Sequence, residues 1–229
     1  MSFETATMSG AVISSNTRLA EEFLARFTNG EICLHPTDTI PGLTFDPHHT
    51  SSIDLLMKIK GRESTKSFIG LVAHQEFAEK NWLPLPDGWQ DALKKLWPGP
   101  LSVIWRASGN APKSMVTTDG MIALRCPLLS ESDSWFNEVL VKLIGVPLPT
   151  SSVNRSGETA ADNWVAAVEW CDLAGGIYVP PVKLEHKESY KTQASSLIRI
   201  ADDGNWELLR AGPVTQTKIK EAFRRDQSE

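Results

Sequence analysis

The sequence predicts an α/β fold, on three observations. Short apolar runs alternate with helical patterns along the 229 residues, as strands and helices do in an α/β domain. Several apolar runs are rich in Ile, Val and Leu without strict alternation, as expected for strands covered on both faces. Hydrophobic residues make up 41% and charged residues 22% of the chain, a globular balance that excludes disorder as a description of the whole chain.

The apolar runs predict seven strands, and the periodic segments between them predict helices. Leu19, Phe23 and Phe27 recur four residues apart in the first helix, with Asn16 as its N-cap and Gly30 beyond its end. No internal repeat or long linker interrupts the pattern, so one domain over 1–229 is expected. The predicted strands are 31–35, 68–73, 101–106, 121–126, 177–179, 195–200 and 206–210, and the helices are 17–28, 53–60, 87–97, 134–144 and 160–171.

Charge and cysteine content exclude several classes of protein. The net charge of −5 argues against broad nucleic-acid binding, which needs an excess of Lys and Arg. Cys33, Cys126 and Cys171 are too widely spaced to support a zinc site or a disulfide framework. No segment has a signal-peptide core or the roughly 20 apolar residues of a membrane span. We therefore expect a cytoplasmic protein that does not associate with membranes.

Residues 35–43 form the first segment with polar groups suited to a ligand. They follow a predicted strand, and ligands of open α/β sheets bind beyond the carboxyl ends of strands. Two prolines and a glycine fix the path of the chain, while Thr37 and Thr39 supply hydroxyls. A rigid turn, in which Asp38 bonds its own backbone, explains the segment equally well.

The helix predicted at 53–60, which Ser51 or Ser52 can cap and Gly61 can end, carries the second polar feature. Lys60 stands seven residues after Ile53 and falls on the buried face, whereas Lys58 points away. A lysine on that face either reaches solvent at the helix end or holds an anion. In the second case Arg62, just beyond Gly61, adds a forked donor to the same anion.

The third polar segment, 149–157, is predicted as a loop before a helix. Five of its nine residues are Ser, Thr or Asn, which suits a cradle for phosphate or ribose as well as an ordinary N-capping loop. The standard phosphate-loop, dinucleotide and nucleophile-elbow motifs are absent from the sequence. A nucleotide would therefore bind on a less common scaffold.

Taken in order, seven short motifs resemble the YrdC-like threonylcarbamoyl-adenylate synthase family. Each motif alone is weak, but their common order over residues 15–213 is specific. The motifs stand at 36–39 with 42–43, 60–62, 97–101, 125–127, 152–157, 195–196 and 209–212.

The resemblance implies a YrdC-like fold, in which a twisted mixed β-sheet with flanking helices presents a concave cationic face. It also implies the short, single-domain form of the family. Residues 214–229 lie beyond the resemblance, and their charged composition predicts a segment that is helical or frayed. The catalytic residues would be Lys60 and Arg62. The implied ATP-binding residues are Lys60, Arg62, Ser152, Asn154 and Arg210, and the implied threonine-binding residues are Thr39, Lys66, Arg125, Thr150 and Ser195.

The reaction implied by the family joins L-threonine, bicarbonate and ATP into threonylcarbamoyl-AMP and pyrophosphate, for modification of a tRNA adenosine. Mg²⁺ would arrive with ATP rather than occupy a dedicated protein site. The product would pass to a tRNA threonylcarbamoyl transferase, with at most weak tRNA contact. No residue is assigned as a general base.

Departures from the family pattern at Pro41, Thr44, Glu63, Ser67 and Val153 bear on substrate identity more than on fold. One alternative is a YrdC-fold nucleotide- or RNA-binding protein without synthase activity. Another is a carbamoyl-adenylate enzyme with a different acceptor, although no zinc-finger or acylphosphatase-like segment accompanies the motifs.

Overall fold

The computed structural model describes residues 15–61, 68–143, 145–182 and 193–224. Its helices are α1 (Ser15–Thr28), α2 (Thr50–Lys60), α3 (Gln75–Asn81), α4 (Trp89–Lys94), α5 (Ser134–Lys142), α6 (Trp164–Ala174) and α7 (Gln216–Ala222), with two short 3₁₀ turns. Its strands are β1 (Ile32–His35), β2 (Gly42–Thr44), β3 (Ile69–Leu71), β4 (Leu101–Arg106), β5 (Met121–Arg125), β6 (Leu148–Ser152), β7 (Ile177–Tyr178), β8 (Ser196–Ile200) and β9 (Trp206–Arg210).

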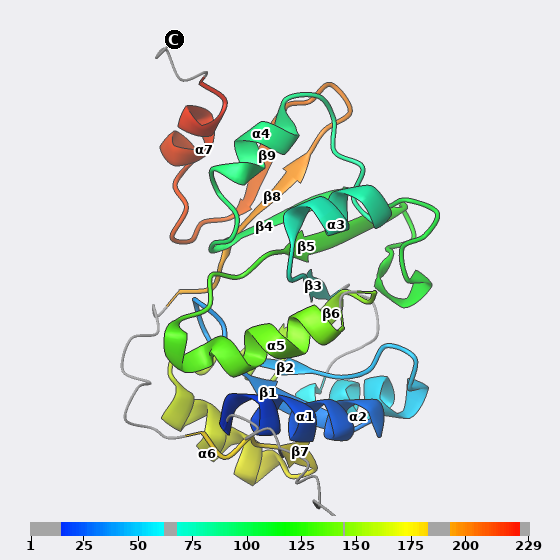
Figure 1. Ribbon diagram of the computed structural model, residues 1–229, viewed down its shortest axis with the longest axis vertical. Coiled ribbons are helices and arrows are strands. Elements are labelled where there is room, and N and C mark those ends of the chain that lie inside the picture. The colour runs from blue at the N-terminus through cyan, green and yellow to red at the C-terminus, as the bar shows by residue number, and fades with distance from the viewer. Residues whose placement is uncertain (1–14, 62–67, 144, 183–192, 225–229) are drawn as a thin grey trace, which may run out of the picture.

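All nine strands join one sheet in the order β7-β1-β2-β6-β3-β5-β4-β8-β9 (Figure 1). The pairs β1–β7, β3–β5 and β4–β8 are parallel, and the other five pairs are antiparallel. The predicted α/β class with a mixed, twisted sheet is therefore confirmed.

Helices cover both faces of the sheet at the β1 end. Helices α1 and α5 lie side by side over one face (Figure 1) and share an apolar cluster with Cys33. Helices α2 and α6 share a second cluster with Ile32 and Leu34. Because β1 sends side chains into both clusters, its sequence is continuously apolar until His35.

At the β9 end, α3, α4 and α7 pack with strands β4, β5 and β8 around a third apolar cluster. Leu101, Val103 and Trp105 of β4 enter this cluster, so the alternating Ser102 belongs to the opposite face of the sheet. That opposite face carries polar side chains in the part of the chain that the structure describes, and the candidate site lies there.

The prediction of a loop at residues 149–157 is wrong for the first part of that segment. Leu148–Ser152 are not a loop but β6, a strand in the middle of the sheet, paired with β2 on one edge and with β3 on the other. The pairing with β2 covers residues 150–152 and the pairing with β3 covers residues 148–150, so the backbone of this segment takes part in the sheet. Any contact with a ligand is then left to its Ser and Thr side chains. Strand β2 and helix α3 were not predicted either, and β2 begins within the segment 35–43 that was interpreted as a loop.

Two predicted helix caps are also wrong. Asn16 lies inside α1 and donates to the Ser134 hydroxyl at 2.9 Å. Ser52 lies inside α2, where its hydroxyl donates to the Gly30 carbonyl at 2.5 Å. Both side chains make tertiary contacts that local sequence does not encode. The predicted end of α2 is confirmed, since Gly61 has a φ of +59° and its N–H bonds to the last turn.

Candidate functional site

The loop between β1 and β2 is held by threonine hydroxyls. The Thr37 hydroxyl donates to the Ile40 carbonyl at 2.8 Å and accepts the Thr39 N–H at 3.1 Å. The two hydroxyl oxygens of Thr37 and Thr39 are 3.0 Å apart. Both side chains are buried, so the loop is a rigid wall rather than a solvated turn.

Arg125, at the end of β5, anchors this loop to the sheet. Its guanidinium donates to the Thr39 hydroxyl at 2.9 Å, to the Gly99 carbonyl at 3.4 Å and to the carboxylate of Asp38. The Arg125 and Asp38 side chains are only 6% and 10% exposed, so Asp38 pairs with an arginine instead of its own backbone. Burial lowers the pKa of Arg125, and the charge of Asp38 opposes that shift.

Arg210, at the end of β9, supplies a second cation. Its Nε donates to the Ser195 carbonyl at 2.9 Å, and its Nη2 donates to the Ser195 hydroxyl at 3.1 Å. The Ser102 hydroxyl fixes Ser195 from below at 2.8 Å. Burial lowers the pKa of Arg210, and the positive charge of Arg125 lowers it further. Two mutually repelling, partly desolvated arginines favour an anionic ligand between them.

These groups meet in one hollow of about 180 Å³, which we call the arginine hollow. It is lined by residues of strands β2, β3, β5, β6 and β9 and of the loops 36–41 and 193–195. Six of the sequence-predicted site residues line it together with Thr37 and Ser151, namely Thr39, Arg125, Thr150, Ser152, Ser195 and Arg210.

Behind the hollow lies a polar residue to which no role was assigned from the sequence, His35. The ring is fully buried and stacks on Phe136, with centroids 4.8 Å apart and planes 13° from parallel. Its Nε2 is 2.8 Å from the Thr150 hydroxyl, and its Nδ1 is 3.0 Å from the Pro36 carbonyl. Burial lowers the pKa of His35 to about 4. An imidazole that ends an apolar strand beside the first motif was the available signal.

Lys60 sits on the buried face of α2, as predicted, and is 3% exposed, whereas Lys58 is exposed. Its ammonium donates to the Ser152 carbonyl at 2.5 Å and to the Asn154 amide oxygen at 3.2 Å. The Ser156 N–H returns a bond of 2.8 Å to the Lys60 carbonyl. The end of α2 is therefore tied to the segment that follows β6, and two distant motifs meet.

The structure does not bring every predicted residue into the hollow. Lys60 and Asn154 adjoin it through Ser152 but do not line it. Asn154 instead closes its own turn by donating to the carbonyls of Arg155 and Glu158, both at 2.8 Å. Arg62 and Lys66 lie outside the described residues.

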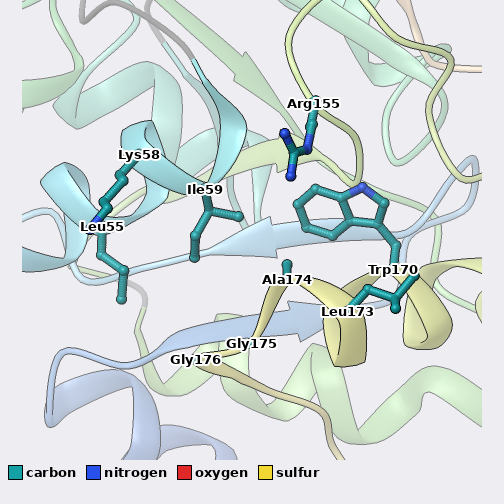
Figure 2. A pocket seen from close by; sticks show the side chains of 9 residues that line it. All are labelled: Leu55, Lys58, Ile59, Arg155, Trp170, Leu173, Ala174, Gly175 and Gly176. Carbon is teal, nitrogen blue, oxygen red and sulfur yellow. The ribbon is translucent and has the colours of Figure 1, made fainter.

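A larger hollow of about 600 Å³ lies between α2 and α6 (Figure 2). Leu55, Ile59, Trp170 and Leu173 give it an apolar lining, and its cations come from Lys58 and Arg155, with Arg155 beside the indole of Trp170 (Figure 2). None of the sequence-predicted site residues lines it. We place the candidate site in the smaller arginine hollow, because donors and acceptors from several strands converge there.

Two further features, a metal-binding group and a membrane-spanning helix, are absent from the described residues. Within residues 15–61, 68–143, 145–182 and 193–224, no group of three or more His, Cys, Asp or Glu side chains is arranged to hold a metal ion. No helix in the same residues is long and apolar enough to cross a membrane.

Comparison with known proteins places the chain in a family. A family profile described as "Telomere recombination" and named for Sua5, YciO and YrdC matches residues 25–212. The chain is 27% identical over 200 residues to a putative threonylcarbamoyl-AMP synthase of Mycobacterium leprae, with 87% of this chain and 86% of the relative covered. It is 30% identical over 177 residues to the threonylcarbamoyl-AMP synthase of Chromohalobacter salexigens, with 74% of this chain and 92% of the relative covered.

Among solved structures, P. abyssi Sua5 in complex with L-threonine superposes with a TM-score of 0.73 at 19% identity. The match covers 92% of this chain but only 58% of the Sua5 chain, so the present chain spans less than two thirds of that protein. The likeness is one of fold, whereas the profile match covers most of the sequence. The chain belongs to the Sua5/YciO/YrdC family.

Proposed function

We propose that the chain is an L-threonylcarbamoyladenylate synthase, an enzyme that transfers an adenylyl group to N-carboxythreonine. The observation that carries the proposal is the arginine hollow, in which Arg125 and Arg210 face threonine and serine hydroxyls across a space of about 180 Å³. A zwitterionic amino acid needs both kinds of group. The relatives that share most of the sequence are named for this reaction.

Threonine binds in the arginine hollow with its carboxylate at the guanidinium groups. Arg125 uses three of its five N–H donors on Thr39, Asp38 and Gly99, and two remain for a ligand. Arg210 spends two donors on Ser195 and keeps three. Arg125, held from three sides, therefore fixes the orientation of the carboxylate, since preorganised forks lose little entropy on binding. We also propose that Lys66 binds threonine, on the basis of the family motif alone.

The nucleotide binds next to threonine, where α2 meets the segment after β6. Ser152 is shared by the hollow and by the Lys60 contact, so the ATP phosphates lie between the two. Lys60, Arg62 and Arg210 offset their negative charge, with Asn154 shaping the turn that holds the nucleotide. Mg²⁺ enters as part of the MgATP substrate.

The chemistry is a displacement at phosphorus. A carbamate oxygen of N-carboxythreonine attacks the α-phosphorus, a new P–O bond forms, and the bond to the pyrophosphate oxygen breaks with its electron pair leaving on pyrophosphate. Such a transfer depends on positioning and charge neutralisation rather than on a covalent nucleophile. No general base is assigned.

The product then passes to a tRNA threonylcarbamoyl transferase in the cytoplasm. We propose that the chain itself contacts tRNA only weakly, because its net charge is −5 and extended phosphate contact needs an excess of cations. Direct transfer to the next enzyme suits a mixed anhydride of a carbamate, which water hydrolyses readily.

The direct test is incubation with threonine, bicarbonate and MgATP, followed by measurement of pyrophosphate and of a threonine-dependent adenylate by mass spectrometry. Reactions lacking threonine or bicarbonate are the controls, and both are expected to give no adduct. Binding of ATP without any adduct in the complete reaction would reject the synthase and favour a nucleotide-binding protein that kept the fold.

A further inference from the structure

The hydrogen-bonding direction of the Thr150 hydroxyl is fixed by His35. A carbonyl oxygen only accepts, so the contact of 3.0 Å between His35 Nδ1 and the Pro36 carbonyl requires a hydrogen on Nδ1. The buried ring is neutral near pH 7, since burial lowers its pKa to about 4 and the charge of Arg125 acts in the same direction. Nε2 therefore carries a lone pair, and the Thr150 hydroxyl must donate to it at 2.8 Å. Thr150 is left with lone pairs only for a ligand.

The hydrogen of the neighbouring Thr39 hydroxyl is also used in a hydrogen bond within the protein. The Thr37 hydroxyl gives its hydrogen to the Ile40 carbonyl, so the hydrogen of the Thr37–Thr39 contact comes from Thr39. The Thr39 oxygen then accepts from Arg125. All three threonines that line the hollow, Thr37, Thr39 and Thr150, thus have their hydroxyl hydrogens engaged within the protein and can only accept from a ligand. Arg125 and Arg210 act as donors.

We propose that His35 is a positioning residue, which through Thr150 makes one end of the arginine hollow select a hydrogen-bond donor such as an ammonium group. An α-amino acid then binds with its ammonium at Thr150 and its carboxylate at the arginines, and this polarity rejects the reversed orientation. The identity of that amino acid as threonine rests on the proposed function, whereas the direction of the His35–Thr150 bond rests on the two imidazole contacts and on the neutral state of the buried ring.

The surrounding packing holds the imidazole in this orientation. The ring is fully buried against Phe136 and cannot turn without breaking the stack. A Cβ on Gly42 would lie 2.5 Å from the Thr150 hydroxyl and 2.6 Å from His35 Nε2, so the backbone of β2 closes directly over the bond. Water and ligand are thereby kept from replacing either partner.

The first experiment determines, without any substrate, which ring nitrogen of His35 carries the hydrogen. In protein labelled with ¹⁵N-histidine, the His35 ring is expected to show a protonated Nδ1 and an unprotonated Nε2 near pH 7. Thr150→Val should shift the Nε2 resonance and leave Nδ1 protonated. A proton on Nε2 in the wild type would overturn the inference whatever the enzyme catalyses.

The second experiment measures selectivity by calorimetry with L-threonine and with 3-hydroxybutanoate, which has hydrogen in place of the amino group. His35→Phe keeps the stacked ring but frees the Thr150 hydroxyl, so the preference for threonine should fall roughly tenfold. His35→Gln, whose amide oxygen can accept from Thr150, should restore most of the preference. Phe23→Leu is the control, because it loosens the packing against Phe136 while the His35 stack and the hydrogen bond to Thr150 remain.

A double-mutant cycle separates positioning from general structure. If His35 acts through Thr150, His35→Phe should weaken threonine binding in the wild type and add nothing in Thr150→Val. Equal losses in both backgrounds would overturn the inference. Absence of threonine binding and of the adenylate in the wild type would reject the proposed function and the amino-acid ligand together, a result distinct from a failed cycle in an active enzyme.

Discussion

At the scale of single residues, the Asp38–Arg125 pair is the most buried salt bridge among the residues that the structure describes. Both side chains are about nine-tenths buried or more, and a buried charge is tolerated only while it has a partner. The pair also orients the guanidinium that the proposed function assigns to the carboxylate of threonine. Stability and substrate binding therefore depend on the same contact.

Asp38→Asn should lower the free energy of unfolding by about 3 kcal/mol, because it leaves the buried Arg125 charge uncompensated. Urea denaturation measures this loss. The matched control is Asp202→Asn, which breaks the exposed pair with Arg106 and should change stability little. Similar losses in the two variants would contradict the burial argument.

His35 predicts a pH dependence of stability. Its pKa is about 4 in the folded chain and 6.5 in its ordinary state, so protons bind preferentially to the unfolded chain. The stabilisation that His35 contributes should be fully present above about pH 6.5. The free energy of unfolding should then fall by about 3 kcal/mol as the pH drops toward 4. Urea titrations of the wild type and His35→Gln should converge over this range, whereas a constant difference would contradict the assignment.

At the scale of elements, segments with a local apolar pattern were predictable, whereas a strand that depends on pairing with distant strands was not. Helix α2 and its end at Gly61 follow from local spacing, and so does the burial of Lys60. Strand β6 was missed because its Ser and Thr residues obtain their strand conformation from β2 and β3. Six of the predicted site residues meet in one hollow, yet the Lys60–Ser152 contact and the His35–Thr150 bond depend on pairings across about a hundred residues of sequence.

The two lysines on α2 test the helix-face argument. Lys60→Ala removes the ammonium that holds the segment after β6, and we expect ATP affinity to fall roughly tenfold. Lys58→Ala, on the exposed face two residues away, should leave that affinity nearly unchanged. Calorimetric titration with MgATP measures both, and equal effects would contradict the assignment of the buried face.

At the scale of the whole molecule, the candidate site draws on strands from most of the sheet, so a ligand should stabilise the fold as a unit. Threonine at 100 times its dissociation constant should add about 2.7 kcal/mol to the free energy of unfolding. Arg125→Lys lacks the planar fork and should show a smaller increase at the same concentration. An unchanged urea midpoint at a concentration where calorimetry detects binding would contradict a site that spans the sheet.

The central position of β6 also determines how the binding surface moves. Thr150 lies where β6 is paired with both β2 and β3, so its amide hydrogen can exchange with solvent only when the sheet itself opens. The floor of the hollow is then among the slowest-exchanging parts of the chain. Substrate discrimination at this floor therefore comes from a surface set during folding, and the hydrogen-bonded loop 36–41 beside it is fixed in the same way.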